Sequence, residues 1–383
     1  MFSKPTSVFP NAASTAGTDI RGHNLLLSFY IPALSAGGAE RVALTLAEHF
    51  TGMGIRCDLV TAAQDGAWAS HVPSGVRHIA LGHKKPLHAV PRLIGYLHRE
   101  RPAVLLSSVF PANIAALLAC TFARTPCVIR EANRSADDTR ARAGLQTWLN
   151  RTALRVLYPR ADAIIVLSAG LAAHLREFAP IMPAKITVIP NPAPAPVMGA
   201  SAPRVGSVPL VLACGRLEQQ KDFSTLLEAF SRIRALRAAR LVILGTGSLE
   251  GQLRGQARAL GIDASVDFAG HVEDVHAWMR RASVFALSSR WEGFPNVLLE
   301  ALSQRCPVVA TDCSDAVSEV LADGKLGAIV PIGDADALAT ALLAVIDGQR
   351  RYDDPSAHLA HYAIDKIAQR YLDVLAVAAS RTV

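Results

Sequence analysis

Two glutamates, Glu292 and Glu300, flank a short turn between a strand and a helix in the second half of the chain. The apolar run 283–287 before them is typical of a buried parallel strand, and Pro295 suits the first position of the following helix, where its missing N–H costs nothing. In open α/β sheets ligands bind at such turns, and the helix N-terminus favours phosphate. A carboxylate there cannot hold a bare phosphate but accepts hydrogen bonds from hydroxyls. Phosphate and polyol at one turn indicate a nucleotide sugar.

Two cations follow another predicted strand, 210–213. Arg216 and Lys221 lie five residues apart in the loop that leaves this strand. An arginine can bind two phosphate oxygens with its planar fork, while a lysine acts as a point charge. The pair could therefore neutralise a leaving diphosphate without a metal ion. Taken by itself, the pair also fits an ordinary basic turn.

Paired glycines follow two further strands. Gly37 and Gly38 open the first predicted helix, where glycine lets the backbone approach a ligand closely and the helix start offers N–H groups; a plain tight turn is the alternative. Gly245 and Gly247 follow the strand 240–244, but Glu250 stands where the dinucleotide-binding fingerprint requires its third glycine. An enzyme that transfers a hydride with a dinucleotide cofactor is therefore poorly supported by the sequence.

The stretch 288–302 closely resembles the donor signature of the retaining glycosyltransferases of family 4, which have the GT-B fold. A surface loop with two solvated glutamates is the alternative for the Glu-x7-Glu spacing alone. The resemblance implies that Glu292 lies near the transferred sugar and that Glu300 binds the ribose hydroxyls. It also implies donor contacts from the residues after the first glutamate: Gly293, Phe294, Pro295 and Asn296.

The other motifs match the same family. Arg216 and Lys221 match its Gly-Arg…Lys-Asp element, and the resemblance gives them catalytic roles on the leaving diphosphate. The loop with Gly37 and Gly38 matches the family's glycine loop, which faces the donor across the cleft. The turn with Gly245 and Gly247 would lie on the nucleotide side. His271, after the strand 266–269, would line the base pocket as a wall or rim residue rather than as a catalyst.

One position in the first half departs from the family pattern. Many relatives carry a histidine after the strand that ends near residue 130, whereas this chain has Ala132 there. In those relatives the histidine contacts the sugar or supports the reaction. We expect Glu131 or Asn133 to take over part of this role, and we count Glu131 among the catalytic residues. A carboxylate paired with a neighbouring arginine is the alternative for Glu131.

Strand and helix signals alternate through both halves, which predicts parallel sheets covered by helices. We therefore expect an α/β protein of GT-B fold, with two Rossmann-like domains facing across a cleft. The proline-rich segment after residue 190 predicts a stiff linker. The expected parts are a flexible N-terminal arm at 1–22, an acceptor-side domain at 23–190, a linker at 191–208, a nucleotide-sugar-binding domain at 209–352 and a C-terminal helix at 353–383.

The last segment should return to the first domain, as it does in GT-B enzymes. Its apolar residues recur with helical spacing. We expect the following side chains to pack on the first domain: Ile364, Ile367, Tyr371, Leu372 and Leu375.

The positive charge lies in the first half. The 383 residues carry a net charge of +7, but residues 1–190 hold 20 Lys and Arg against 11 Asp and Glu, a net charge of +9. Such asymmetry fits an anionic partner. The chain lacks zinc-finger, RRM and KH patterns, so an anionic membrane face or a lipid-diphosphate acceptor fits better than nucleic acid. A merely solubilising surface is the alternative.

Composition limits the remaining classes. The sequence contains no apolar run of 18 residues and no recognisable signal peptide, so we expect a cytoplasmic protein, either free or peripheral on the inner face of the plasma membrane. The six cysteines lack metal-ligand spacing and are expected to be buried free thiols. His358 and His361 have no third ligand nearby, so we expect neither a metal site nor a cofactor beyond the co-substrate.

These observations predict a metal-independent retaining glycosyltransferase. It would move a sugar from a nucleoside-diphosphate sugar to a glycan or polyprenyl-diphosphate-linked acceptor in surface polysaccharide synthesis. A nucleotide-sugar epimerase of the same fold is one alternative. The other is a non-catalytic sugar-nucleotide-binding subunit, which the missing histidine favours and the intact Arg216, Lys221, Glu292 and Glu300 oppose. The sugar, the base and the acceptor cannot be read from the sequence.

Overall fold

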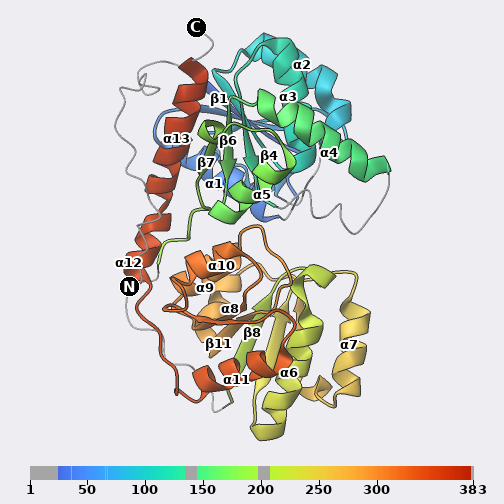
Figure 1. Ribbon diagram of the computed structural model, residues 1–383, viewed down its shortest axis with the longest axis vertical. Coiled ribbons are helices and arrows are strands. Elements are labelled where there is room, and N and C mark those ends of the chain that lie inside the picture. The colour runs from blue at the N-terminus through green and yellow to red at the C-terminus, as the bar shows by residue number, and fades with distance from the viewer. Residues whose placement is uncertain are drawn as a thin grey trace.

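The computed structural model describes residues 25–35, 37–64, 66, 68–133, 145–196 and 208–380. These residues form two parallel sheets, each covered by helices on both faces, stacked one above the other along the long axis of the molecule (Figure 1). The expected arm at 1–22 and the greater part of the expected linker lie outside the described residues. The limits of the domains stay a prediction.

The first sheet has seven strands in the order β3-β2-β1-β4-β5-β6-β7, all paired in parallel. The strand order reverses between β1 and β4, which is where open α/β sheets bind ligands. The strands are β1 (Leu26–Ile31), β2 (Arg56–Thr61), β3 (Arg77–Ala80), β4 (Val104–Ser108), β5 (Cys127–Glu131), β6 (Ala163–Val166) and β7 (Ile186–Val188).

The second sheet has six parallel strands in the order β10-β9-β8-β11-β12-β13. Its order reverses between β8 and β11, and these two strands lead into the loops that carry Arg216 and Glu292. The strands are β8 (Leu210–Cys214), β9 (Arg240–Leu244), β10 (Val266–Gly270), β11 (Val284–Leu287), β12 (Val308–Thr311) and β13 (Ala328–Val330).

The helices cover both faces of each sheet. In the first half they are α1 (Gly38–Gly52), α2 (Val90–Glu100), α3 (Phe110–Ala123), α4 (Leu145–Leu157) and α5 (Ala169–Phe178). In the second half they are α6 (Phe223–Leu236), α7 (Glu250–Ala259), α8 (Val275–Arg281), α9 (Asn296–Ser303), α10 (Asp315–Val320), α11 (Ala335–Ile346), α12 (Ser356–Leu359) and α13 (Ile364–Ser380). The sequence pattern does not single out α4, because Trp148 and Leu149 on its exposed side blur the apolar period.

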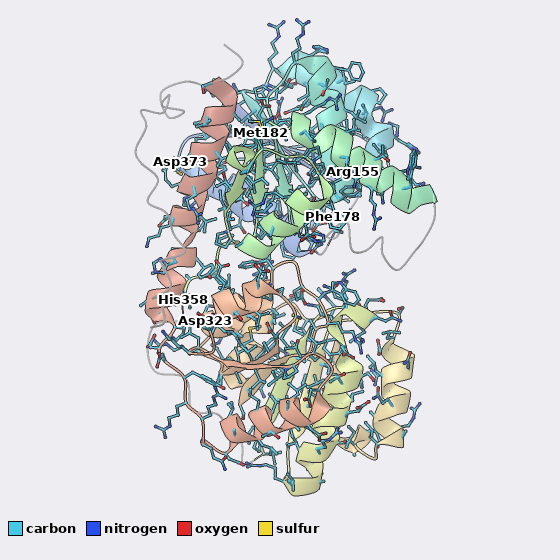
Figure 2. All side chains as sticks on the ribbon, viewed as in Figure 1. Arg155, Phe178, Met182, Asp323, His358 and Asp373 are labelled. Carbon is cyan, nitrogen blue, oxygen red and sulfur yellow. The ribbon has the colours of Figure 1, made fainter. Side chains whose placement is uncertain are left out.

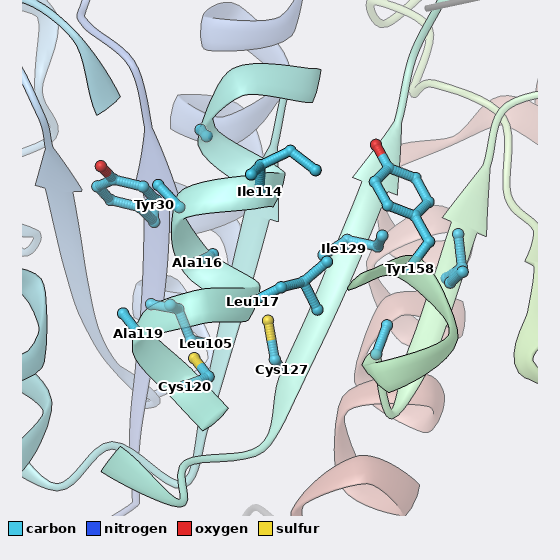
Figure 3. Packing of buried hydrophobic residues seen from close by; sticks show 14 of the residues in the cluster. Tyr30, Leu105, Ile114, Ala116, Leu117, Ala119, Cys120, Cys127, Ile129 and Tyr158 are labelled. Atoms are coloured by element: carbon cyan, nitrogen blue, oxygen red, sulfur yellow. The ribbon is translucent and has the colours of Figure 1, made fainter. Parts of the chain in front are cut away.

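Helix α3 illustrates how the core fixes the first sheet. Its side chains Leu117 and Cys120 are buried against Leu105 and Ile129 of the strands beneath (Figure 3). Full burial of one such leucine stabilises the fold by about 1.5–3 kcal/mol. The carboxyl ends of the strands, where the loops of the site begin, are therefore held by a rigid base.

Helix α13 runs alongside the first domain after the chain has passed through the second (Figure 1). Ile367, Tyr371, Leu372 and Leu375 are buried in one cluster with residues of β1 and α1, and Ile364 packs against it partly buried. The predicted return of the last helix is thus confirmed. The two chain connections between the domains touch, since Ala193 N–H donates to the Tyr362 carbonyl (2.8 Å).

Candidate functional site

The loops after β8 and β11 form one hydrogen-bonded unit. Ser288 Oγ donates to the Lys221 carbonyl (2.7 Å), and the Arg290 N–H donates to the Gln220 carbonyl (2.8 Å). The Arg290 side chain also donates from Nε to Asp222 Oδ2 (3.0 Å). The neighbouring strands bring these loops together, as the sequence predicts, and the cross-links hold them in one arrangement.

Glu292 lies buried at the centre of this unit, with 8% of its surface exposed. Its Oε1 accepts hydrogen bonds from Lys221 Nζ (2.6 Å) and Ser289 Oγ (2.7 Å), and its Oε2 accepts one from Gln220 Nε2 (3.4 Å). A buried carboxylate is stable only when paired and hydrogen-bonded in this way. Sequence reasoning missed Ser289 and Gln220, whose only signal is their closeness in sequence to the two charged residues.

Arg216 joins the same set through a neutral side chain. Its Nη2 donates to Gln220 Oε1 (3.3 Å), so Gln220 links the guanidinium to Glu292. The Arg216 side chain is exposed, whereas Lys221 is half-buried. The structure thus brings together the two predicted cations and the first predicted carboxylate. An anion approaching this loop meets the exposed guanidinium first.

The glycines at 245 and 247 allow two backbone segments to pack directly. A Cβ on Gly245, whose φ is +126°, would lie 2.0 Å from the Gly215 carbonyl oxygen, and one on Gly247 would lie 2.5 Å from the Leu217 nitrogen. Leu217 N–H donates across this contact to the Thr246 carbonyl (3.0 Å). In this structure the two glycines therefore support the Arg216 loop. Their predicted contact with the donor stays a prediction.

An unpredicted carboxylate completes that support. Glu218 accepts hydrogen bonds from both N–H and Oγ of Ser248 (3.0 Å each). These bonds stabilise the charged carboxylate and so hold the pKa of Glu218 below its ordinary value. Nearby, His271 follows β10 and is exposed, which suits its predicted place at the rim of a base pocket.

The donor helix α9 begins at Asn296, so Pro295 takes the position just before the helix rather than its first position. The prediction for Pro295 was one residue off, because its backbone (φ −83°, ψ 75°) is not yet helical. Phe294 is buried in the core cluster with Leu298 and anchors the loop.

Glu300, one turn into α9, meets the first domain. Its Oε1 accepts a hydrogen bond from Arg41 Nη1 (3.1 Å), and its Oε2 lies 3.9 Å from His276 Nε2. Arg41 belongs to the first turns of α1, directly after the glycine loop. At the end of β8, burial and, to a lesser degree, the charge of Glu300 raise the pKa of the Cys214 thiol to about 11. The second predicted carboxylate and the glycine loop therefore share one contact across the cleft.

The glycine loop also approaches Asn296, the first residue of α9, which follows the loop 288–295 (here called the donor loop). A Cβ on Gly38 would lie 3.0 Å from Asn296 Nδ2, and one on Gly37 would lie 2.2 Å from Glu40 Oε2. Glu40 in turn accepts a hydrogen bond from Ser35 Oγ (2.7 Å). Sequence reasoning assigned no role to Glu40, which holds the shape of this loop beside the helix start.

Gly293 packs closely against the first domain. A Cβ on it would lie 1.9 Å from the Ala132 carbonyl oxygen and 2.5 Å from Asn133 Oδ1. Ala132 is the residue that replaces the histidine of many relatives. Its neighbourhood is filled by the backbone of the donor loop, which favours small residues on both sides.

Glu131 lies apart from this group, on the first-domain side. It is buried and accepts a hydrogen bond from Tyr158 Oη (2.5 Å). Burial and the charge of Glu131 raise the pKa of Tyr158 well above its usual range. Glu131 also lines a small pocket whose walls come mainly from α4 and α5. The other residues around this pocket are Asn133, Leu154, Leu171, His174, Leu175 and Phe178.

The part of the chain described by the structure contains no group of three or more His, Cys, Asp or Glu residues that could hold a metal ion. Within the same residues, no helix is long and apolar enough to cross a bilayer. The described cysteines are free thiols, and five of the six are buried, which fits their predicted structural role.

Two family profiles match the chain. The family described as Glycosyltransferase Family 4 matches residues 36–195, and the family described as Glycosyl transferases group 1 matches residues 208–348. The first match contains the glycine loop and Glu131. The second contains the Arg216 loop and the whole donor signature.

Two curated relatives match over more than four fifths of the chain. The N-acetylgalactosamine-N,N'-diacetylbacillosaminyl-diphospho-undecaprenol 4-alpha-N-acetylgalactosaminyltransferase of Campylobacter jejuni is 24% identical over 351 residues, which are 85% of this chain and 91% of the relative. A second transferase of the same organism, GalNAc-alpha-(1->4)-GalNAc-alpha-(1->3)-diNAcBac-PP-undecaprenol alpha-1,4-N-acetyl-D-galactosaminyltransferase, is 27% identical over 336 residues, which are 84% and 89% of the two chains.

The fold is also found among solved structures. Anabaena HepE in complex with UDP superposes with a TM-score of 0.77 at 19% identity, covering 92% of this chain and 99% of that chain. Together with the two parallel sheets and the returning helix, this likeness confirms the predicted GT-B fold.

Proposed function

Since this chain belongs to family 4 of the glycosyltransferases, we propose that it transfers a sugar, with retention, from a nucleoside-diphosphate sugar to a lipid-linked glycan. The relatives named for undecaprenol-diphosphate acceptors support that acceptor class, and HepE solved with UDP supports the donor class. We propose that this transfer belongs to surface polysaccharide synthesis on the cytoplasmic side of the membrane.

One observation carries the proposal. The carboxylate assigned to the ribose, Glu300, is bonded to Arg41 of the glycine-loop helix (3.1 Å), so the motifs assigned to the two sides of one donor meet in space. These motifs are 259 residues apart in sequence. If both motifs bind the same donor, their meeting at the Arg41–Glu300 pair is explained.

The proposed chemistry uses positioning and charge. The bond between the anomeric carbon and the diphosphate oxygen breaks while the acceptor hydroxyl attacks on the same face, and the departing phosphate takes the acceptor proton. Arg216 and Lys221 stabilise the charge that develops on the diphosphate. Glu292, fixed by Lys221 and Ser289, orients the sugar, and Glu131 with its pocket takes part on the acceptor side.

A thermal-shift screen against UDP-, GDP- and ADP-sugars tests the donor class. A ligand that binds only the native state raises the unfolding temperature by mass action. We expect one nucleotide family to stabilise the protein, and no stabilisation by any of them would contradict the proposal. Incubation with the selected donor and no acceptor then separates the alternatives. An epimerase interconverts sugars, a transferase gives slow hydrolysis, and a non-catalytic subunit gives neither, even with acceptor.

Helix α4 supports a membrane contact for the first domain. Trp148 (62% exposed), Leu149 (46%) and Val156 (49%) lie on its outer side, and the helix contains Arg151 and Arg155 but no acidic residue. Figure 2 shows Arg155 on the outer side of the first domain, where its Nε donates to the Phe178 carbonyl (3.2 Å). Exposed tryptophan beside arginine suits the surface of an anionic bilayer.

Vesicle binding tests this contact. We expect the full chain to bind phosphatidylglycerol vesicles reversibly, with a blue shift of tryptophan fluorescence that is absent in Trp148→Phe. Each basic residue near such a surface contributes about 1 kcal/mol, and salt screens the attraction. Trp278→Phe, on the second domain, is the matched control and should keep the shift. If the protein ignores anionic vesicles at low salt, the charge is only solubilising and a soluble acceptor becomes the better proposal.

A further inference from the structure

Arg130, at the end of β5, is a buried arginine held by neutral groups. It is 2% exposed, and its guanidinium donates to Ser108 Oγ (2.9 Å), Tyr371 Oη (3.0 Å) and Asn191 Oδ1 (2.5 Å). Burial raises the pKa of Tyr371, so this partner stays uncharged. Among the described residues, no carboxylate pairs with Arg130. Since an unpaired buried charge is costly, the arrangement calls for a function.

The hydrogen bonds from Arg130 fix the orientation of two neighbouring side-chain amides. A guanidinium has only donors, so Asn191 must turn its Oδ1 toward Arg130 and its Nδ2 away. That Nδ2 donates to Asn296 Oδ1 (2.6 Å). Asn296 must therefore turn its own Nδ2 away from Asn191.

The outward Nδ2 of Asn296 points to the predicted donor site. It lies 3.0 Å from where a Cβ on Gly38 would be, between the glycine loop and the start of α9. In the described part of the chain this nitrogen donates to no protein acceptor. Its two N–H groups are available for a ligand oxygen.

We propose that Arg130 and Asn191 are positioning residues that fix the polarity of Asn296, so that its amide donates to an oxygen of the diphosphate-sugar. This inference rests on the proposed function. If the Asn296 amide were reversed, a carbonyl oxygen would face the diphosphate, and the two would repel each other. Arg130 thus acts through two neutral amides, without contacting the ligand.

Asn191→Asp is the decisive variant. The aspartate keeps the shape of the side chain and accepts from Arg130 with an added charge attraction, but it cannot donate to Asn296. The Asn296 amide must then turn its Nδ2 to residue 191 and present Oδ1 to the ligand. A hydrogen bond to a charged group is worth about tenfold or more in affinity. We expect at least tenfold weaker binding with an unfolding temperature that does not fall.

The measurement is calorimetric titration with UDP-glucose, GDP-mannose and ADP-glucose, using whichever binds the unaltered protein. Asn150→Asp, on α4, makes the same chemical change away from the cleft and should bind normally. Asn296→Asp removes the outward donor directly at a half-buried position and should match Asn191→Asp. If Asn191→Asp does not fold, the comparison of Arg130→Met with Arg130→Lys decides the question instead.

Substitutions of Arg130 separate its effect on the orientation of the two amides from its contribution to packing. Arg130→Lys keeps a donor-only cation and should retain most of the affinity, whereas Arg130→Met should lose it. If the unaltered protein binds none of the three nucleotides, the proposed function fails. If it binds one of them and folded Asn191→Asp binds it within twofold, the positioning role is wrong.

Discussion

The two sides of the cleft are built differently. On the second domain, Glu292 has three hydrogen-bond partners from two cross-linked loops and is buried. On the first domain, Arg41 meets Glu300 with a side chain that is 46% exposed. The fixed second-domain side suits chemistry that depends on preorganised charge, whereas an exposed ion pair such as Arg41–Glu300 contributes little and is easily broken. Substitutions on the two sides should therefore differ in size and in the kinetic constant they change.

The largest effect should come from Glu292→Gln. The amide keeps the shape but loses the charge that pairs with Lys221, so both residues lose their positions around the reacting sugar. We expect kcat to fall by about a hundredfold with little change in KM, as for a group acting mainly in the transition state. Steady-state kinetics with the identified donor measure this. A variant that raises KM and leaves kcat unchanged would remove Glu292 from the chemistry.

A smaller effect should follow Glu300→Ala, on the same side of the cleft. A ribose contact is made equally in the ground and transition states, so its loss raises KM and leaves kcat nearly unchanged. We expect donor affinity about tenfold weaker. Titration with the free nucleoside diphosphate is the measurement, because it omits the sugar. Unaltered affinity would disprove the ribose assignment.

Arg41→Ala should have a milder effect, because it removes only the first-domain partner. Exposed ion pairs are worth about 0.2–1 kcal/mol, so we expect at most about a fivefold rise in KM, and less at high salt. Arg56→Ala, an exposed arginine at the start of β2, is the control. A hundredfold loss would show instead that Arg41 belongs with the fixed side.

Chelation should produce the smallest change. Arg216 and Lys221 supply the positive charge proposed for the leaving diphosphate, so activity in EDTA should stay within about twofold of activity in buffer. Assays with and without added magnesium or manganese test this. Complete loss that either metal restores would overturn metal independence.

The sequence predicted the donor side far better than the first-domain side. Apolar runs and family motifs located the strands around Arg216 and Glu292, because local patterns determine both. The bonds from Ser289 and Gln220 to Glu292 depend on how two distant loops dock, and no local pattern records that. The contact of Gly293 with Ala132 joins two domains, so sequence reasoning found an absent histidine there but not the backbone that fills its place.

The two connections between the domains touch where the Ala193 N–H donates to the Tyr362 carbonyl. Two connections that touch restrict the relative motion of the domains more than one connection does, because the second opposes rotation about the first. A cut in one connection would leave the domains joined by the other. Such a restriction favours one arrangement of the two domains, the one in which Gly293 and Arg41 meet their partners.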